Sequence, residues 1–231
     1  MKLKDLAFLL GIFIILSPFI FCDYCYAGYV SFNASHPYVM AFIKFAILST
    51  IGEASGLRVK TGNYTQPNFG VFPRFILWGL FGVWIAVAMK SFASGVPVMV
   101  ESLGIDGAVA SMKGPLTLTR VFTAFMISVM MNTIFAPVFM TLHKITDAHI
   151  LKNGGKAISL FRPINMAQGF RDVNWDVQWG FVFKKTIPLF WFPAHTITFL
   201  LPGEFQVLFA ALLSVALGLI LSVAAVMSRK S

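Results

Sequence analysis

Hydrophobic residues along this chain are grouped in long blocks rather than placed on alternating faces. A helix of about 20 apolar residues spans a hydrocarbon core of about 30 Å, and a backbone in lipid must satisfy its own hydrogen bonds. The pattern therefore predicts an all-α, multi-span transmembrane bundle of about six helices. The six blocks are Leu6–Phe21, Tyr38–Leu57, Phe75–Gly95, Val121–Leu142, Ile187–Pro202 and Phe205–Met227.

The first block admits two interpretations. Its short basic start and apolar run are typical of a signal peptide, but no small-residue cleavage site follows it. We therefore expect a retained anchor, and cleavage would leave five helices in the same orientation. The pattern predicts an anchor with an outer loop over residues 1–35. It predicts a helical bundle over residues 36–231, with an inner loop at 143–186.

Composition leaves little room for a soluble domain. Hydrophobic residues make up 58% of the chain and charged residues only 12%, against about 25% charged in soluble proteins. The net charge is +9. If the N-terminus is cytoplasmic, only four of the 18 basic residues fall away from the inner side: Lys44, Lys90, Lys113 and Arg120. This positive-inside bias predicts that both termini are cytoplasmic.

The same charge distribution bears on partners and location. It predicts contact with the lipid bilayer through anionic headgroups. It argues against nucleic acid, because no basic face with stacking aromatic residues lies outside the blocks. An apolar N-terminal anchor without an Arg- and Ser-rich transit segment favours the plasma (inner) membrane, with an organelle membrane as the alternative.

Glu53 is the clearest functional candidate, because ionisable groups inside a membrane are costly and commonly functional. It shares a helical face with Ser49 and Gly56, so it should face protein rather than lipid. Two interpretations stay open. Glu53 forms a gate, ion or proton site, or it is an interfacial carboxylate that pairs with Arg58, Lys60 or Arg74.

Three other polar side chains lie within blocks and are candidates for a pathway. Lys44 and Lys90 would either extend their ammonium groups to water or line an aqueous cavity that favours anions. Asn132 lies near the middle of its block, where it would bond across helices or line a pore. Pro137 frees the carbonyl of Thr133, because proline has no N–H.

The block Ile187–Pro202 is short and carries Pro188, Pro193 and His195. Broken helices at membrane depth occur where protein or a water-filled cavity surrounds them. His195 is therefore a pathway candidate if this block is broken, and the alternative is a kinked structural helix. Pro137 and Pro193 are the expected helix breaks.

Small residues at four-residue spacing predict helix packing. Gly52 and Gly56 form a Gly-x-x-x-Gly pair, which allows close helix approach. Ser214 and Gly218 lie on a similar stripe in the last block. These stripes would pack within the monomer or between the protomers of a homo-oligomer.

No catalytic, metal or cofactor site is expected. Cys22 and Cys25 form a Cys-x-x-Cys pair without the two further ligands that zinc requires. His143 and His149 lie six positions apart, on different helical faces. The chain also lacks the common nucleotide-binding and hydrolase motifs.

The order of several short motifs resembles the Mpv/PMP family of small multi-span membrane proteins, named for Mpv-seventeen and a peroxisomal membrane protein. The resemblance spans roughly His36 to the C-terminus. The matching positions are His36-Pro37, Gly52-Glu53, Arg74 followed by Gly79 and Gly82, Asn132 with Phe135-Ala136-Pro137, and Trp191, Pro193, Phe199 and Pro202.

Departures from the family pattern mark the chain as a divergent, bacterial-type member. Glu53 replaces an Asp, Leu57 stands where the family prefers Gln, and Met131 stands where it has Asp. The first block is an extra element, and the second family helix lacks its Gly-Pro with downstream His and Tyr. The resemblance implies a channel-like or membrane-homeostasis role.

The sequence thus predicts a channel-like pathway for small solutes or ions, lined by Glu53, Lys44, Asn132 and the segment around His195. The alternative is a structural membrane protein that organises lipids or partner proteins without transport. A pathway requires these side chains to converge on one cavity, whereas a scaffold requires them to be paired individually in a tightly packed bundle.

Overall fold

The computed structural model describes residues 3–227, with side chains through Ile220 and at Ser222, and these residues form no strand. This confirms the all-α fold class. The chain divides into two compact units, Met1–Met40 and Ala41–Ser231, close to the predicted boundary after residue 35. Each unit is described by itself.

The first unit contains the helices α1 (Leu3–Phe21) and α2 (Asp23–Ser35) and the start of α3, through Met40. Residues 23–35 were expected to form an outer loop, and that expectation is wrong. Cys22 caps the start of α2, because its Sγ accepts a hydrogen bond from the Cys25 N–H at 3.3 Å. Phe19 and Tyr29 pack edge to face across the two helices, with ring centroids 5.3 Å apart.

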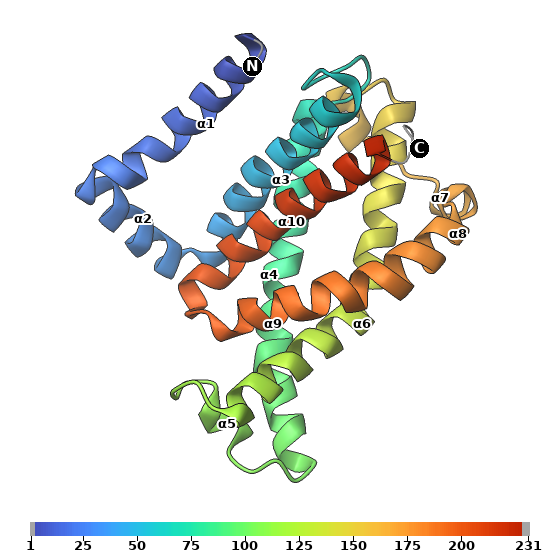
Figure 1. Cartoon of the computed structure of the whole chain (residues 1–231). Helices are drawn as coiled ribbons and strands as arrows, with labels where there is room; N and C mark the ends of the chain where they lie inside the picture. The colour runs from blue at the N-terminus through green and yellow to red at the C-terminus, as the bar shows by residue number, and fades with distance from the viewer. Residues whose placement is uncertain (1–2, 228–231) are drawn as a thin grey trace. The chain divides into compact units, whose positions relative to one another are not determined.

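The second unit holds most of the helices (Figure 1). Figure 1 places the short α5 at the end where α4 and α6 meet. The elements in chain order are α3 (Pro37–Thr61), α4 (Val71–Ser102), α5 (Ala108–Ser111), α6 (Leu118–Lys152), the 3₁₀-helix η1 (Ala157–Leu160), α7 (Met166–Asp172), α8 (Trp175–Val177), the π-helix η2 (Gln178–Trp191), α9 (Phe192–Leu200) and α10 (Gly203–Met227).

Five helices within the described part of the chain are long and apolar enough to cross a membrane. They correspond to five of the six predicted blocks and are compatible with an integral membrane protein. The spans are Leu3–Phe21, Pro37–Thr61, Val71–Ser102, Leu118–Lys152 and Gly203–Ile220.

The remaining block, Ile187–Pro202, belongs to an uninterrupted helical run over residues 175–200. Its central part is π-helical, as the N–H of Phe192 bonds the carbonyl of Ile187, five residues back. The helix breaks expected at Pro193 and Pro137 do not occur. The run continues through Pro193 at the start of α9, and α6 continues through Pro137.

The expected inner loop at 143–186 is also shorter than predicted. Helix α6 continues to Lys152 and the helical run that contains η2 begins at Trp175, so only residues 153–174 connect the two long helices. Some of the polar residues near the end of α6 contact protein and lie within the helix. One of them, Asp147, is bonded to Arg74 of α4.

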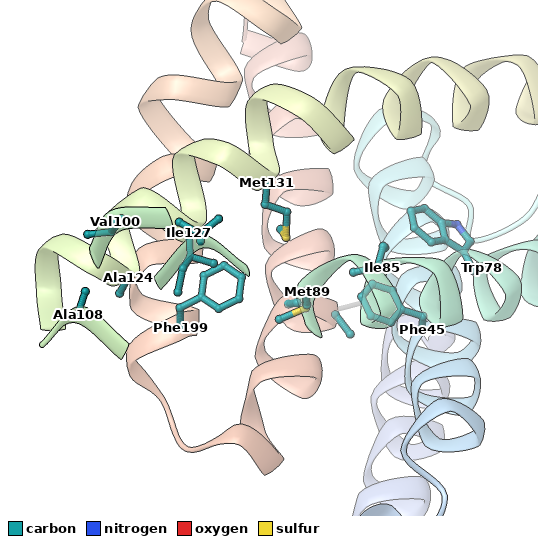
Figure 2. Packing of buried hydrophobic residues seen from close by; sticks show 13 residues of the cluster. Phe45, Trp78, Ile85, Met89, Val100, Ala108, Ala124, Ile127, Met131 and Phe199 are labelled. Atoms are coloured by element: carbon teal, nitrogen blue, oxygen red, sulfur yellow. The ribbon is translucent and has the colours of Figure 1, made fainter. Parts of the chain in front are cut away.

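Two hydrophobic clusters form the core of the second unit, and the smaller one lies around Ile187 and Trp191 of η2. The larger one is elongated and lies among α3, α4, α5, α6, α9 and α10. Figure 2 shows it running from Ala108 and Val100 at one end to Phe45 and Trp78 at the other. Phe45, Ile127 and Phe199 are essentially fully buried. Helix α6 packs against both α4 and α9.

Candidate functional site

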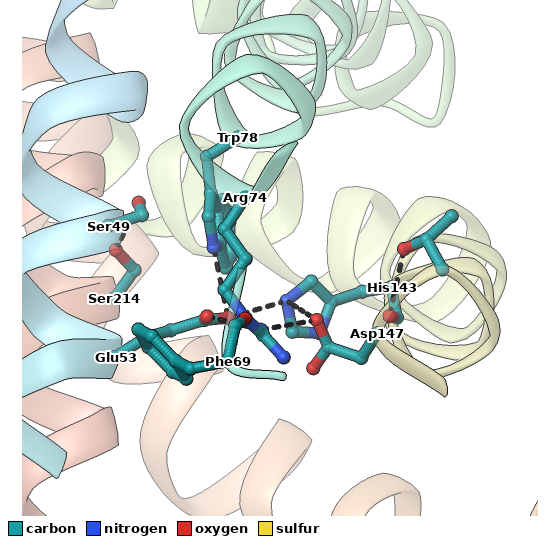
Figure 3. Close-up of polar contacts among 9 residues, drawn as sticks. Ser49, Glu53, Phe69, Arg74, Trp78, His143, Asp147 and Ser214 are labelled. Carbon is teal, nitrogen blue, oxygen red and sulfur yellow. Dashed lines mark hydrogen bonds and ion pairs between the residues drawn. The ribbon is translucent and has the colours of Figure 1, made fainter. Parts of the chain in front are cut away.

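Arg74 joins three helices at the centre of a charged network (Figure 3). Its Nη1 donates to Oε2 of Glu53 on α3 and, at 2.6 Å, to Oδ1 of Asp147 on α6. Its Nε donates to the carbonyl of Phe69 at 2.7 Å. Arg74 is only 6% exposed. Buried charges of this kind need both an opposite charge and hydrogen bonds, and Arg74 has both.

Two aromatic side chains also donate hydrogen bonds to Glu53. The indole Nε1 of Trp78 donates to Oε1 of Glu53 at 3.0 Å. The imidazole Nε2 of His143 lies 3.1 Å from the same oxygen and 3.8 Å from Oδ1 of Asp147. Because a carboxylate only accepts hydrogen bonds, His143 carries its proton on Nε2 in this arrangement.

The formal charge of this network depends on one group. Two carboxylates and one guanidinium leave a net charge of −1 when the imidazole of His143 is neutral. Protonation of the imidazole brings the sum to zero. The guanidinium of Arg74 therefore neutralises only one of the two carboxylates.

The network forms one end of a cavity of about 480 Å³. The volume falls in the range of about 300–1,000 Å³ that ligand sites occupy. Helices α3, α4, α6, η2, α9 and α10 all contribute to its walls. Glu53, Arg74, His143 and Asp147 line the polar end, and Asn132 and His195 lie deeper along the same cavity.

Asn132 and His195 are paired with each other. The Nδ2 of Asn132 lies 3.0 Å from the Nδ1 of His195. The same Nδ2 donates to the carbonyl of Ser128 at 2.8 Å. The hydroxyl of Ser128 donates to the carbonyl of Phe192 at 2.8 Å. These bonds hold α6 and α9 together, as expected of polar groups between helices.

The structure separates the two intramembrane lysines from the other candidates. Glu53, Asn132 and His195 line one cavity, whereas neither Lys44 nor Lys90 is among its lining residues. Lys90 is exposed, as an ammonium group extended to water requires. Lys44 is only 6% exposed, so the expectation that it extends to water is wrong.

The small residues bring α3 against α10. A Cβ added to Gly52 would lie 3.0 Å from the Cα of Val215, and one added to Gly56 would lie 2.8 Å from the hydroxyl of Ser222. The carbonyl of Gly52 approaches Gly218 within the same contact, and Ser49 and Ser214 share a hydrogen bond of 2.9 Å. The two stripes therefore pack against each other within the chain.

The carboxylates and imidazole also have the composition of a metal site. Glu53, His143 and Asp147 each offer one ligand atom, and these atoms lie within 4.8 Å of one another. However, the guanidinium of Arg74 is bonded to both carboxylates and occupies the place of a cation. A divalent ion would have to displace it, so these residues fit an internal ion pair better than a metal.

Sequence reasoning identified Glu53 and named Arg74 as one of three possible partners, but it missed Trp78, His143 and Asp147. The only local signal was the four-residue spacing of His143 and Asp147, which places both on one helical face. That Glu53 lies opposite this face depends on how α3, α4 and α6 pack. Comparison of the chain with protein-family models, curated proteins and solved structures gives no match.

Proposed function

We propose that this integral membrane protein forms, or contributes to, a channel-like pathway for small solutes or ions. The observation that carries the proposal is the cavity that joins the Glu53–Arg74 network to the Asn132–His195 pair. Polar groups within spanning helices are costly, and they are commonly found where they line an aqueous path or a binding site. A role confined to packing would not require a cavity of ligand size between them.

The same proposal assigns the chain to the Mpv/PMP family as a divergent member. Four positions that carry the resemblance, Glu53, Arg74, Asn132 and Trp191, line this single cavity. On the positive-inside distribution of its basic residues, we place both termini in the cytoplasm. We assign it a role in transport rather than catalysis, with the lipid bilayer and no nucleic acid as its partner.

Flux through liposomes tests the pathway. Purified protein is reconstituted, and ionic conductance and the efflux of small solutes are recorded for the wild type and for Glu53→Gln. We expect the wild type to make liposomes permeable and Glu53→Gln to change that permeability several-fold. Glu204→Gln is the matched control, because Glu204 is exposed at the start of α10 and does not line the cavity. Tight liposomes that contain folded wild-type protein would overturn the proposal.

One observation favours the structural alternative. The segment over α7, α8 and η2 exposes large aromatic side chains, with Trp175 at 43%, Trp179 at 57% and Phe181 at 45%. Exposed tryptophan near basic residues suits the membrane interface. A structural protein would bind lipid or a partner through this segment, and replacing both Trp175 and Trp179 with alanine would weaken membrane organisation without changing permeability.

A further inference from the structure

Unpaired basic groups surround the polar end of the cavity. Lys60 on α3 and Lys144 on α6 are both exposed and both line the cavity. In the described part of the chain, neither ammonium group makes an ion pair or hydrogen bond. Together with Arg74, they set three permanent positive charges against the two carboxylates of the network. The polar end thus favours an anion over a cation.

Arg74 itself keeps donors for a ligand. Its Nε and Nη1 are engaged by Phe69, Glu53 and Asp147. Its Nη2 makes no hydrogen bond to any residue between 3 and 227 that the structure describes, and Figure 3 shows this nitrogen projecting from the network. A guanidinium presents its N–H groups in a plane that matches the oxygens of a carboxylate or phosphate.

Two buried donors on η2 are also without a partner. The Nε2 of Gln178 and the Nε1 of Trp191 find no acceptor among the described residues. Both side chains line the cavity, and they are only 3% and 9% exposed. Buried donors are normally hydrogen-bonded, and one left unpaired costs free energy. Both nitrogens are themselves enclosed, so they are buried polar atoms beside the cavity and not open contacts to its contents.

Beyond the charged groups and the Asn132–His195 pair, much of the cavity wall is apolar. Met131, Phe135 and Phe139 of α6 face it from one side, and Leu217 of α10 from another. A small inorganic anion would make no use of this surface. An apolar chain would remove it from water, which is favourable in proportion to the area buried.

We infer that the cavity binds an amphiphilic organic anion, with its carboxylate or phosphate at Lys60, Lys144 and Arg74 and its apolar chain along α6 and α10. If the proposed pathway exists, such an anion is the class of solute that it carries, so the inference rests on the proposed function in that respect. A free fatty-acid-like molecule and an anionic phospholipid of the bilayer share this chemistry.

Binding of radiolabelled dodecanoate tests the inference. The full-length protein is placed in nanodiscs of phosphatidylcholine, and displaceable binding is measured against empty nanodiscs. We expect saturable binding that excess dodecanoate displaces and that neither acetate, which lacks the chain, nor dodecanol, which lacks the charge, displaces at the same concentration. Equal displacement by dodecanol would overturn the anionic part of the inference.

Charge variants separate the site from the general basic surface. Lys60→Gln combined with Lys144→Gln should weaken dodecanoate binding at least tenfold. Lys156→Gln combined with Lys184→Gln makes the same change in net charge at exposed lysines that do not line the cavity, and it should leave binding unchanged. An equal loss in both double variants would overturn the inference in favour of surface charge alone.

Two variants on one helix test the apolar wall. Leu217→Trp fills the cavity and should abolish dodecanoate binding. Leu212→Trp adds the same side chain at an exposed position of α10 outside the cavity and should bind as the wild type does. A matching melting temperature for both variants shows that the loss is not a folding defect. Wild-type affinity in Leu217→Trp would overturn the placement of the chain.

Two further measurements complete the test. The first identifies the source of the anion, and the second separates failure of this inference from failure of the proposed function. If added phosphatidylglycerol displaces dodecanoate in the wild type, the natural ligand is a bilayer lipid. If it does not, the ligand is a free amphiphile, and either result supports the shared chemistry. Dodecanoate binding in protein that leaves liposomes tight would remove the pathway and keep the site. Permeable liposomes without dodecanoate binding would overturn this inference alone.

Discussion

The Nη1 of Arg74 lies 2.6 Å from the Oδ1 of Asp147, although 73 positions separate the two residues in the chain. The same nitrogen is bonded to Glu53, so one guanidinium ties the first turn of α4 to α3 and α6. All three residues line the polar end of the cavity. The stability of the bundle and the shape of the site therefore depend on the same side chain.

Replacement of Arg74 with glutamine should destabilise the protein by about 3 kcal/mol or more, because it leaves Glu53 and Asp147 partly buried without a counter-charge. The free energy of unfolding in mixed micelles measures the effect. Arg162→Gln is the control, since Arg162 is exposed and its guanidinium donates to the side chain of Asn153 at the surface. The double variant Arg74→Gln with Glu53→Gln should recover part of the loss. If it is no more stable than the single variant, the ion pair does not account for the effect.

Gly82 should not tolerate a methyl group. A Cβ at this position would lie 2.5 Å from the Cβ of Phe45 and 2.7 Å from the carbonyl oxygen of Ala41. Because backbone atoms cannot move aside cheaply, Gly82→Ala should cost about 1–3 kcal/mol. Gly95 lies in the same helix with nothing within 4 Å of its Cβ position. Gly95→Ala should therefore stabilise the protein by about 0.5–1 kcal/mol, and thermal unfolding of the pair gives the comparison.

The contact between α6 and α7 should weaken in acid. Hydrogen bonds from Lys152, at 2.6 Å, and from Gln168 hold the pKa of Asp172 below its usual value. A lowered pKa in the folded state adds stability above the pKa of the unfolded chain, about 3.9, and this stability is lost as the pH falls through the folded value. Amide exchange of residues 166–172, corrected for intrinsic rates, should accelerate between pH 5 and 3.

Asp172→Asn should remove this pH dependence and exchange faster at pH 6. Asp176→Asn, at a nearby exposed position, should behave as the wild type does. A pH profile that survives the removal of Asp172 would assign the effect to another group.

Cys22 should react faster than Cys25 with alkylating agents. The Cys25 thiol and the Cys25 N–H both donate to the Cys22 sulfur, which lowers the pKa of Cys22 and raises that of Cys25. A lower pKa means more thiolate at a given pH, and the thiolate is the nucleophile. Mass spectrometry after brief treatment with iodoacetamide at pH 7.5 should show Cys22 modified several-fold more. Cys25→Ala should slow the modification of Cys22, and equal rates in the wild type would contradict the assignment.

The helices of this protein could be predicted from the sequence because membrane spans are specified locally. A charge-free run of sufficient length has few alternatives in lipid, and five of the six predicted blocks are helices long enough to span. The burial of the Glu53 face and the close approach at Gly52 and Gly56 were equally local, since they follow from four-residue spacing.

The site could be predicted only in part, because its members come from separate helices. The choice of Arg74 over Arg58 and Lys60 as the partner of Glu53 depends on where the first turn of α4 lies relative to α3. The burial of Lys44 depends likewise on packing rather than on its position in the block. The winding of η2 has no known local signal, so Gln178 and Trp191 could not be placed on one wall from sequence.

That winding has a geometric consequence for η2. An α-helix turns once every 3.6 residues or so, and over the 14 residues of η2 this angle would leave Gln178 and Trp191 on opposite sides of the rod. A π-helix has wider turns, of about 4.4 residues, and makes about two thirds of a revolution fewer over the same length, so both ends face the same way. A single helix thus forms one wall of the cavity along its whole length. Rewinding η2 as an α-helix would rotate the indole of Trp191 away from the side on which the amide of Gln178 lies.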